Sequence, residues 1–217
     1  MTDFAKLRER MVERQIAARG ITNPAILAAF RSVPRETFVA EDLAHSAYDD
    51  GPLPIEAGQT ISQPYIVALM VEASQIQRGD RVLEIGAGSG YAAAIISRIA
   101  GHVTAIERHA ELVGIARDRL RQLGYDNVDV LHGDGSVGCP ERAPFHAILA
   151  AASGSHIPAA LISQLAPGGR LVTPIGEPHG DQQLVKLTKR PDGTTVEQSL
   201  GGVRFVPLIG EEGWRDA

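Results

Sequence analysis

The residues of this chain with the clearest chemical potential form the run Glu84-Ile85-Gly86-Ala87-Gly88-Ser89-Gly90, in which an acid precedes alternating glycines. The run follows a short apolar segment, 81–85, and precedes a helical pattern that begins at Tyr91. Glycine has no Cβ, so the backbone can turn sharply there and approach a ligand closely. In an open α/β sheet such a turn lies at the carboxyl edge, where ligands bind. The residues that we expect at this ligand site are Glu84, Gly86, Gly88 and Gly90.

The spacing of the glycines distinguishes between two kinds of cofactor. A dinucleotide fingerprint, G-x-G-x-x-G, requires its third glycine at position 91, where this chain has Tyr91. The spacing G-x-G-x-G behind an acid suits S-adenosylmethionine, which has no pyrophosphate to place at a helix N-terminus. Glu84 can anchor the ammonium group of that cofactor, directly or through water. The alternative is a simple tight turn, but a turn alone does not require these glycines together with the acid.

Two further acids follow the next two predicted strands. Glu107 ends the second strand and Asp134 follows the third, in the run Gly133-Asp134-Gly135. A carboxylate at position 107 can accept hydrogen bonds from both ribose hydroxyls, and Asp134, beside Gly135, can accept one from the adenine amino group. Taken alone, Glu107 has the less favoured alternative of a solvated acid at a helix start beside Arg108, and Asp134 would form an Asx turn more often than it would bind a ligand. Together with the glycines they predict a nucleoside pocket.

The elements that must position these residues alternate along the chain. Strand patterns and helix patterns follow one another from about residue 62, which predicts a mostly parallel sheet with helices on both faces. Pro167-Gly168-Gly169 is a turn signal before the fifth strand. We expect strands at Arg81–Ile85, His102–Glu107, Val128–His132, Phe145–Ala151 and Arg170–Pro174, and helices at Tyr91–Ile99, Glu111–Leu123 and Pro158–Leu165.

The two ends of the chain differ from this middle part. The last part has strand patterns at Gln183–Arg190, Thr194–Leu200 and Val203–Leu208, which predict antiparallel strands added to the parallel sheet. The first part, about residues 1–60, has helical and loop character, with Asn23-Pro24 as a helix start. We therefore expect one domain over residues 1–217, in which an N-terminal extension, 1–60, packs on an α/β core, 61–217. The expected core is a Rossmann-like, mostly parallel seven-stranded sheet.

The composition excludes several classes of protein. The chain has 217 residues, is 44% hydrophobic and 22% charged, and has a net charge of -5. These values argue against disorder, and no apolar stretch approaches the roughly 20 residues of a spanning helix. Cys139 is the only cysteine, so no internal disulfide or cysteine-built zinc site can form. With a charged N-terminus and a pI near 5.8, we expect a cytoplasmic protein without metal that binds neither membrane nor nucleic acid.

Several further strings resemble the protein-L-isoaspartate O-methyltransferase family. The resemblance covers nearly the whole chain, from about residue 5 to 210. The glycine run is shared by many methyltransferases, whereas the string before the first strand and the closing string are much more specific. These strings are Gly58-Gln59-Thr60-Ile61-Ser62-Gln63-Pro64-Tyr65, Glu84 to Gly90, Gly133-Asp134-Gly135, Ala143-Pro144-Phe145, Gln164-Leu165, Pro167-Gly168-Gly169-Arg170-Leu171-Val172 and Val203-Arg204-Phe205-Val206-Pro207-Leu208.

The resemblance implies methyl transfer from S-adenosylmethionine to the α-carboxyl of L-isoaspartyl residues in damaged proteins and peptides, which begins their repair and leaves S-adenosylhomocysteine. It implies that Ser62 is the active-site residue and donates a hydrogen bond to the substrate carboxylate. Gln59, Thr60 and Ile61 then line the cofactor site, Ile61 also contacts the substrate, and Val206 pairs with the substrate backbone. The alternative for Ser62 is a helix N-cap ahead of Pro64. A monomer is the expected state.

This chain departs from the family pattern in two places. His146 stands where the family usually has Asp, and Ala151-Ala152-Ser153-Gly154-Ser155 replaces a run of the Ala-Ala-Pro-Pro type. We interpret His146 as a structural substitution and expect the Ser153-Gly154-Ser155 loop to be more flexible. Two alternatives stay open: a related O-methyltransferase acting on another peptide or small-molecule carboxylate, and a nucleotide-binding oxidoreductase, which Tyr91 opposes. Nucleic-acid methylation is disfavoured because no Asn-Pro-Pro-Tyr or Asp-Pro-Pro-Tyr string is present.

Overall fold

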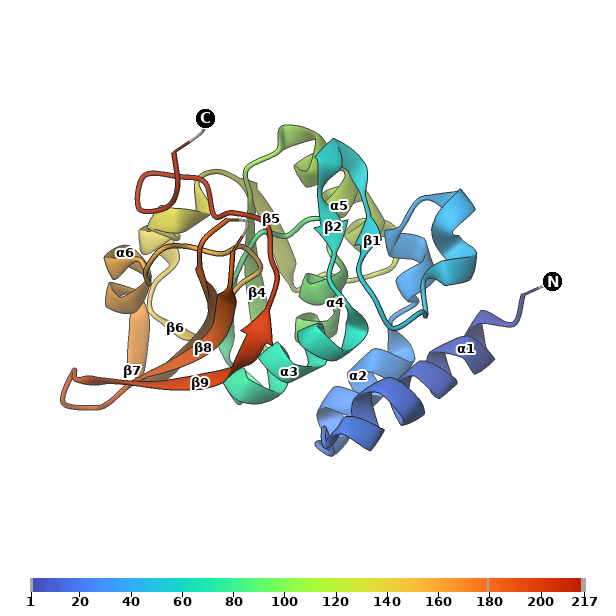
Figure 1. The fold of residues 1–217 in the computed structure, drawn as a ribbon, viewed down its shortest axis with the longest axis horizontal. Coiled ribbons are helices and arrows are strands. Elements are labelled where there is room, and N and C mark those ends of the chain that lie inside the picture. Colours follow the sequence, from blue (N-terminus) through green and yellow to red (C-terminus); the bar gives the residue numbers. More distant parts are fainter. Residues whose placement is uncertain (1, 179, 216–217) are drawn as a thin grey trace.

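The computed structural model describes residues 2–178 and 180–215, and it has a seven-stranded sheet with helices on both faces (Figure 1). The strand order is β5-β4-β3-β6-β7-β8-β9. The strands from β5 to β7 are parallel, β8 is antiparallel to β7, and β9 is antiparallel to β8. The bounds of these strands are β3 (Arg81–Ile85), β4 (His102–Glu107), β5 (Val128–His132), β6 (Phe145–Ala150), β7 (Leu165–Gly176), β8 (Gln182–Lys189) and β9 (Thr195–Val203).

The helices cover both faces and build the N-terminal extension. The α-helices are α1 (Phe4–Met11), α2 (Pro24–Ser32), α3 (Pro64–Ser74), α4 (Tyr91–Ser97), α5 (Ala110–Gln122) and α6 (Ala159–Ser163). Short 3-10 turns and a π-helical turn lie between them: η1 (Val12–Ile16), η2 (Ala17–Arg19), η3 (Arg35–Phe38), η4 (Glu41–Ser46), η5 (Glu56–Gly58), η6 (Gly135–Val137) and η7 (Pro140–Arg142). A small hairpin, β1 (Leu53–Pro54) with β2 (Thr60–Ile61), precedes α3.

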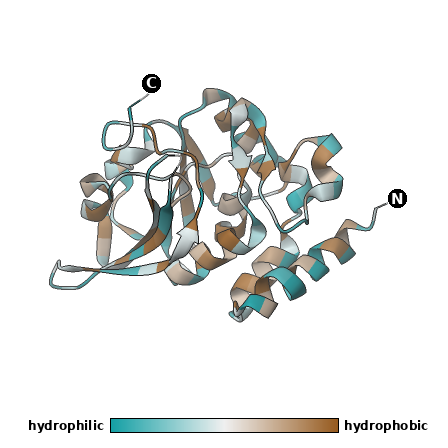
Figure 2. Cartoon of the chain, viewed as in Figure 1, coloured by the Kyte–Doolittle hydropathy of each residue, from teal (hydrophilic) through white to brown (hydrophobic). Residues whose placement is uncertain are grey.

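The sheet is apolar on both faces because both faces are covered. Along β3, Val82 packs in the cluster that includes α3, α4 and α5, whereas Leu83 packs in the cluster that includes Leu161 of α6. Such two-sided burial is typical of parallel strands between helices. In Figure 2 the hydrophobic colours follow α3 and the middle of the sheet, while the far tip of the β8–β9 hairpin is hydrophilic. The strand register places the ends of β3, β4 and β6 along one edge.

The mostly parallel sheet with added antiparallel strands is confirmed, and three details of the prediction are wrong. The segment 203–208 is not a strand, because β9 ends at Val203 and Pro207 then forms only an isolated bridge with Ser153. Proline has no N–H to extend a ladder. Pro167-Gly168-Gly169 lies inside β7 at a register shift instead of before the strand. The helix α6 is correspondingly short, since β7 already begins at Leu165.

Aromatic packing joins the N-terminal extension to the core. Tyr91, the first residue of α4, is 1% exposed, and its ring meets Phe30 of α2 and Phe38 of η3 edge-on. The ring centres lie 6.3 and 5.6 Å apart, within the range at which such pairs are favourable. The extension is therefore fixed to the helix that begins directly after the glycine run.

Candidate active site

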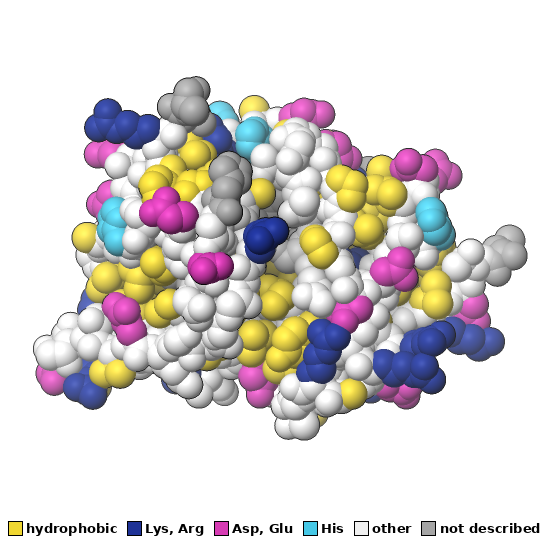
Figure 3. Space-filling model, viewed as in Figure 1, with side chains coloured by type: hydrophobic (Ala, Val, Ile, Leu, Met, Phe, Trp, Pro, Cys, Tyr) yellow, Lys and Arg dark blue, Asp and Glu magenta, His cyan; other side chains and the backbone are white. Residues whose placement is uncertain are grey.

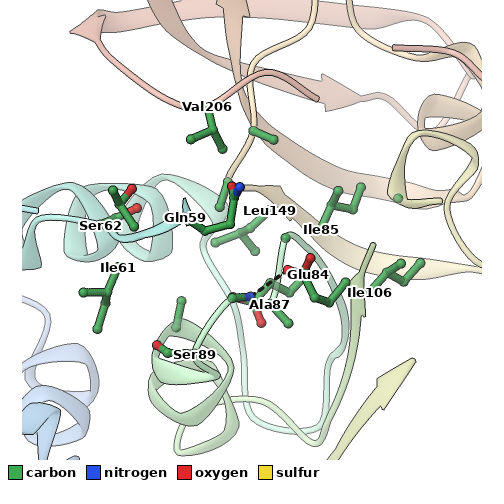
Figure 4. A pocket seen from close by; sticks show the side chains of 18 of the residues that line it. Gln59, Ile61, Ser62, Glu84, Ile85, Ala87, Ser89, Ile106, Leu149 and Val206 are labelled. Atoms are coloured by element: carbon green, nitrogen blue, oxygen red, sulfur yellow. Dashed lines mark hydrogen bonds between the residues drawn. The ribbon is translucent and has the colours of Figure 1, made fainter. Parts of the chain in front are cut away.

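A cavity of about 340 Å³ lies at the carboxyl edge of the sheet. Three segments that are distant in sequence line it: residues 58–62 around β2, residues 84–89 after β3, and residues 206–209 near the C-terminus. Figure 4 shows side chains of these segments directed toward the same space, with Ser62 and Glu84 on different sides of it. Residues predicted from separate motifs are thus brought together. Those that line the cavity are Gln59, Thr60, Ile61, Ser62, Glu84, Gly86, Gly88, Glu107, Gly135 and Val206.

The glycine run turns as the sequence predicts. Gly88 has a φ of 53°, lines the cavity, and donates its N–H to the Glu107 carboxylate at 2.9 Å. Gly90, with a φ of 91°, does not line the cavity. A Cβ at Gly90 would meet Leu120 and Ala116 of α5 at 3.3 and 3.4 Å. The structure therefore places Gly90 where helix packing requires a glycine, and its cofactor role stays a prediction without a cavity contact.

Glu107 is held in place by the backbone. Its two carboxylate oxygens accept hydrogen bonds from the N–H groups of Gly88 and His109, both at 2.9 Å, and the residue is 5% exposed. A carboxylate has about four acceptor positions. Two positions are occupied by the backbone, so the remaining capacity can serve two hydroxyl donors in the cavity.

Glu84 is buried without a comparable partner. It is 2% exposed, lines the cavity, and its Oε2 accepts no hydrogen bond from the residues that the structure describes. Burial raises the pKa of Glu84 well above its usual range, and the negative charge of Glu107 raises it further. An unsatisfied buried carboxyl is costly. A positively charged group in the cavity would satisfy it, which fits the ammonium end of S-adenosylmethionine.

Asp134 lies beside the cavity, and its carboxylate is occupied. Oδ1 accepts hydrogen bonds from the N–H and hydroxyl of Ser136 at 2.8 and 2.7 Å, and Oδ2 accepts one from the Glu211 N–H at 2.7 Å. These bonds lower the pKa of Asp134 against the effect of its partial burial, which is the largest contribution and raises it. The Asx-turn alternative thus describes its contact with Ser136, and the adenine role remains a prediction. Gly135, next to it, does line the cavity.

Ser62 lies between the small hairpin and α3. The N-cap of α3 is Gln63, which makes no side-chain capping bond, so the N-cap alternative for Ser62 is wrong. The side chain of Arg35 donates to the Ser62 carbonyl at 2.9 Å, whereas the Ser62 hydroxyl has no partner among the described residues. The hydroxyl is therefore available to a ligand in the cavity.

Val206 belongs to an extended segment, residues 204–209, that borders the cavity opposite Gln59 and Ser62 (Figure 4). Its carbonyl accepts a hydrogen bond from the Ser153 N–H at 2.8 Å, so that carbonyl is already used within the chain. Its predicted pairing with the substrate backbone therefore stays a prediction.

Neither His146 nor Ser153-Gly154-Ser155 lines the cavity. His146 lies at the amino end of β6, far along the strand from the cavity edge, and its Nδ1 accepts the Arg81 N–H at 3.0 Å. Ser153 is fully buried, and its carbonyl accepts from Leu208 N and Trp214 Nε1 at 2.8 and 2.9 Å. The C-terminal segment is thus hydrogen-bonded to Ser153, and the expected flexibility of this loop stays a prediction.

Sequence reasoning missed some residues of the cavity. Arg108 and His109 line it directly after Glu107, and Leu149 and Ala151 line it at the end of β6. Strand-end position alone is the signal that could have found them, because carboxyl ends of neighbouring parallel strands share one edge. Val67, Met70 and Val71 of α3 also line the cavity, and no local signal distinguishes them from ordinary core residues.

The described residues give no sign of a metal or of a membrane span. Within 2–178 and 180–215 there is no cluster of three or more His, Cys, Asp or Glu side chains suited to a metal ion. No helix in the same ranges is long and apolar enough to cross a bilayer. The polar side chains that line the cavity include the two buried acids Glu84 and Glu107 and the hydroxyl of Ser62.

The sheet is parallel, with antiparallel strands added at one end. A Glu-x-Gly-x-Gly-x-Gly turn follows β3, and an acid ends β4. Together these features define an S-adenosylmethionine-dependent methyltransferase. Residues 6–213 match the family model described as "Protein-L-isoaspartate(D-aspartate) O-methyltransferase (PCMT)". The chain belongs to this family.

Relatives and solved structures agree with that assignment. The chain is 57% identical to protein-L-isoaspartate O-methyltransferase 1 of Rhodopseudomonas palustris strain HaA2, over 98% of this chain and 87% of that protein. It is 56% identical to the corresponding protein of Methylorubrum extorquens strain PA1, over 99% and 93%. A solved protein-L-isoaspartate O-methyltransferase aligns with a TM-score of 0.87 at 32% identity, over 95% of this chain and 67% of that one.

A second solved structure was determined with a ligand. It is a protein-L-isoaspartate O-methyltransferase from Plasmodium falciparum in complex with S-adenosyl-L-homocysteine. Its TM-score is 0.79 at 26% identity, and the alignment covers 93% of this chain and 98% of that one.

Proposed function

We propose that this chain transfers a methyl group from S-adenosylmethionine to the α-carboxyl of L-isoaspartyl residues in damaged proteins and peptides, which begins their repair. The observation that carries the proposal is the single cavity that Ser62 shares with Glu84, Gly88 and Glu107. Ser62 comes from one of the two more specific strings of the family, and the other three are predicted cofactor residues. One cavity therefore unites a donor for the substrate with the residues suited to the cofactor.

The cofactor residues have distinct proposed roles. Glu84 faces the ammonium group, and Glu107 accepts the ribose hydroxyls with the capacity left by its two backbone bonds. Gly86 and Gly88 allow the backbone to approach, Gln59, Thr60 and Ile61 form a further part of the lining, and Gly135 lines the cavity where Asp134, next to it, would meet the base. When bound, S-adenosylmethionine supplies an electrophilic methyl group and leaves as S-adenosylhomocysteine.

The substrate carboxylate needs orientation more than it needs a base. A carboxyl group with a reference pKa near ~3.5–4 is already ionised at neutral pH, so the chain need not remove a proton. Ser62 donates its hydroxyl hydrogen to one carboxylate oxygen and fixes the direction of the other. Ile61 and Val206 border the same space and exclude water from the weakly nucleophilic oxygen. We further propose that the protein acts in the cytoplasm as a monomer, without metal, on peptide substrates.

The test compares a synthetic isoaspartyl peptide with its normal aspartyl counterpart. The two differ in which carboxylate is free and in the length of the backbone. A misplacement of about 1 Å can cost around a hundredfold in rate, so we expect methylation of the isoaspartyl peptide only. Equal methylation of both, or methylation of neither while another carboxylate is accepted, would contradict the repair function and favour a related carboxylate O-methyltransferase.

A further inference from the structure

Arg35 is a fully buried arginine in the N-terminal extension, outside the cavity lining. It is 0% exposed, and no carboxylate of the described residues lies within ion-pair distance of it. Burial lowers its pKa from the ordinary arginine value. Removing a cation from water without a counter-ion is costly, so its position requires an explanation beyond filling the core.

The other basic side chains of the extension behave differently. Lys6, Arg19 and Arg31 keep 86%, 40% and 42% of their side chains exposed, and each pairs with an acid. Figure 3 shows Lys and Arg side chains gathered on the surface in the region where Figure 1 places α1. Arg8 is less exposed, at 17%, but it pairs with Glu36 at 3.1 Å. Arg35 therefore stands apart from its neighbours in both burial and partners.

The partners of Arg35 are two backbone carbonyls and one aromatic ring. Nε donates to the Ala47 carbonyl at 2.7 Å, and Nη2 donates to the Ser62 carbonyl at 2.9 Å. Its guanidinium carbon lies 4.7 Å from the centre of the Tyr91 ring. A planar guanidinium offers five donors in a fixed fork and can stack on a ring face, whereas lysine has a single compact ammonium at the end of a flexible stem. Arg35 thus joins the segment after η4, the Ser62 peptide and the start of α4.

The Ser62 peptide lies between regular elements. The pairing of β2 with β1 ends at Ile61, and α3 begins only at Pro64. No strand or helix bond therefore fixes the Ser62 carbonyl, and Arg35 is the described side chain that holds it. Holding this carbonyl restrains ψ of Ser62, and with it the position from which the Ser62 side chain projects.

We propose that Arg35 is a positioning residue, which orients the Ser62 hydroxyl toward the substrate carboxylate through its hydrogen bond to the Ser62 carbonyl. This inference rests on the proposed function of Ser62. It explains why an unpaired cation is buried behind the cavity, and why Tyr91 follows the glycine run: its ring supports the guanidinium. Arg35 touches neither substrate nor cofactor, so its effect must pass through Ser62.

A double-mutant cycle separates positioning from a general effect on the fold. The cycle compares the wild type, R35K, S62A and the double variant by kcat/KM for an isoaspartyl peptide. If Arg35 acts through Ser62, R35K lowers kcat/KM about tenfold or more in the wild-type background and by less than about twofold in the S62A background. The same loss in both backgrounds would overturn the proposal. R8K, which alters another arginine of the extension, should leave kcat/KM within about twofold of the wild type.

Two further measurements keep failure of this inference distinct from failure of the proposed function. Amide hydrogen exchange over residues 59–63 should rise in R35K and not in R8K, whether or not the isoaspartyl peptide is a substrate. Unchanged exchange in R35K would contradict the inference. An inactive wild type with raised exchange in R35K would instead contradict the proposed function. If R35K does not fold, R35Q, which carries no charge to desolvate, replaces it in the same cycle and exchange experiment.

Discussion

Two walls of the cavity differ in how the chain holds them. Residues 58–62 belong to a hairpin that is tied to buried aromatic and aliphatic side chains of the extension, including Phe38 at 0% exposure. Residues 204–214, which we call the C-terminal strap, are held by hydrogen bonds to Ser153, Ser136 and Asp134 and by the burial of Leu208. Burial of apolar surface is coupled to the whole fold, whereas a few hydrogen bonds can open locally. We therefore expect the wall that carries Ser62 to open locally less readily than the strap.

The largest expected change in the free energy of unfolding comes from a substitution in the N-terminal extension, which supports the wall that carries Ser62. Phe38→Ala should lower the free energy of unfolding by about 3–5 kcal/mol, because it leaves a cavity beside Tyr91 in a fully buried cluster. The matched variant is Phe205→Ala in the strap, where the phenylalanine is only partly buried. We expect the smaller loss there. Urea unfolding of both variants measures the difference, and equal losses would remove the contrast between the two walls.

An intermediate change in stability is expected at Asp134, whose carboxylate accepts a hydrogen bond from the strap. Asp134→Ala removes the acceptor for the Glu211 N–H, and bonds of this kind contribute about 1.5–3 kcal/mol. Amide exchange at Glu211 and Leu208 should become faster while the core stays protected. Glu211→Ala is the control, because only the backbone of Glu211 makes this bond. Slower binding or weaker affinity for S-adenosylhomocysteine with unchanged exchange would instead favour the adenine role of Asp134.

The smallest effect on the free energy of unfolding is expected at Glu84, which lines the cavity at the end of β3. Because the folded pKa is raised, the stability from this carboxyl is fully present below its unfolded pKa and is lost as pH rises through the folded pKa. Glu84→Gln keeps the shape of the side chain and replaces the carboxyl with an amide that cannot ionise. The two proteins should match at low pH, and the variant should become the more stable one as pH rises, while its affinity for S-adenosylhomocysteine falls.

Urea unfolding at several pH values between about 5 and 8 tests this, since that range lies above the reference pKa of glutamate. Parallel stability curves for the wild type and Glu84→Gln would show that folding does not raise the pKa of Glu84. An unchanged affinity would show that Glu84 does not face the ammonium group.

The site could be predicted best where its chemistry is local in the sequence. The turn after β3 follows from glycines that permit positive φ, and Glu84 and Glu107 follow from their place at strand ends. Gly90 and Asp134 have the same local signals, yet one faces α5 and the other binds the strap. Sequence spacing places a residue at the end of a strand, but it does not say which neighbouring segment is closest to its side chain.

The alternation of strands and helices, the kind of cofactor that the glycine run suits and the family of the chain could be predicted from the sequence. The packed fold was needed to show that the segment after β9 folds back onto Ser153, that His146 lies away from the cavity, and that Arg35 reaches Ser62. The physical reason is the range of the interactions. Backbone preferences and hydrophobic periodicity act over a few residues, whereas the bond from Arg35 to Ser62 joins positions 27 residues apart, and only the packed chain brings them together.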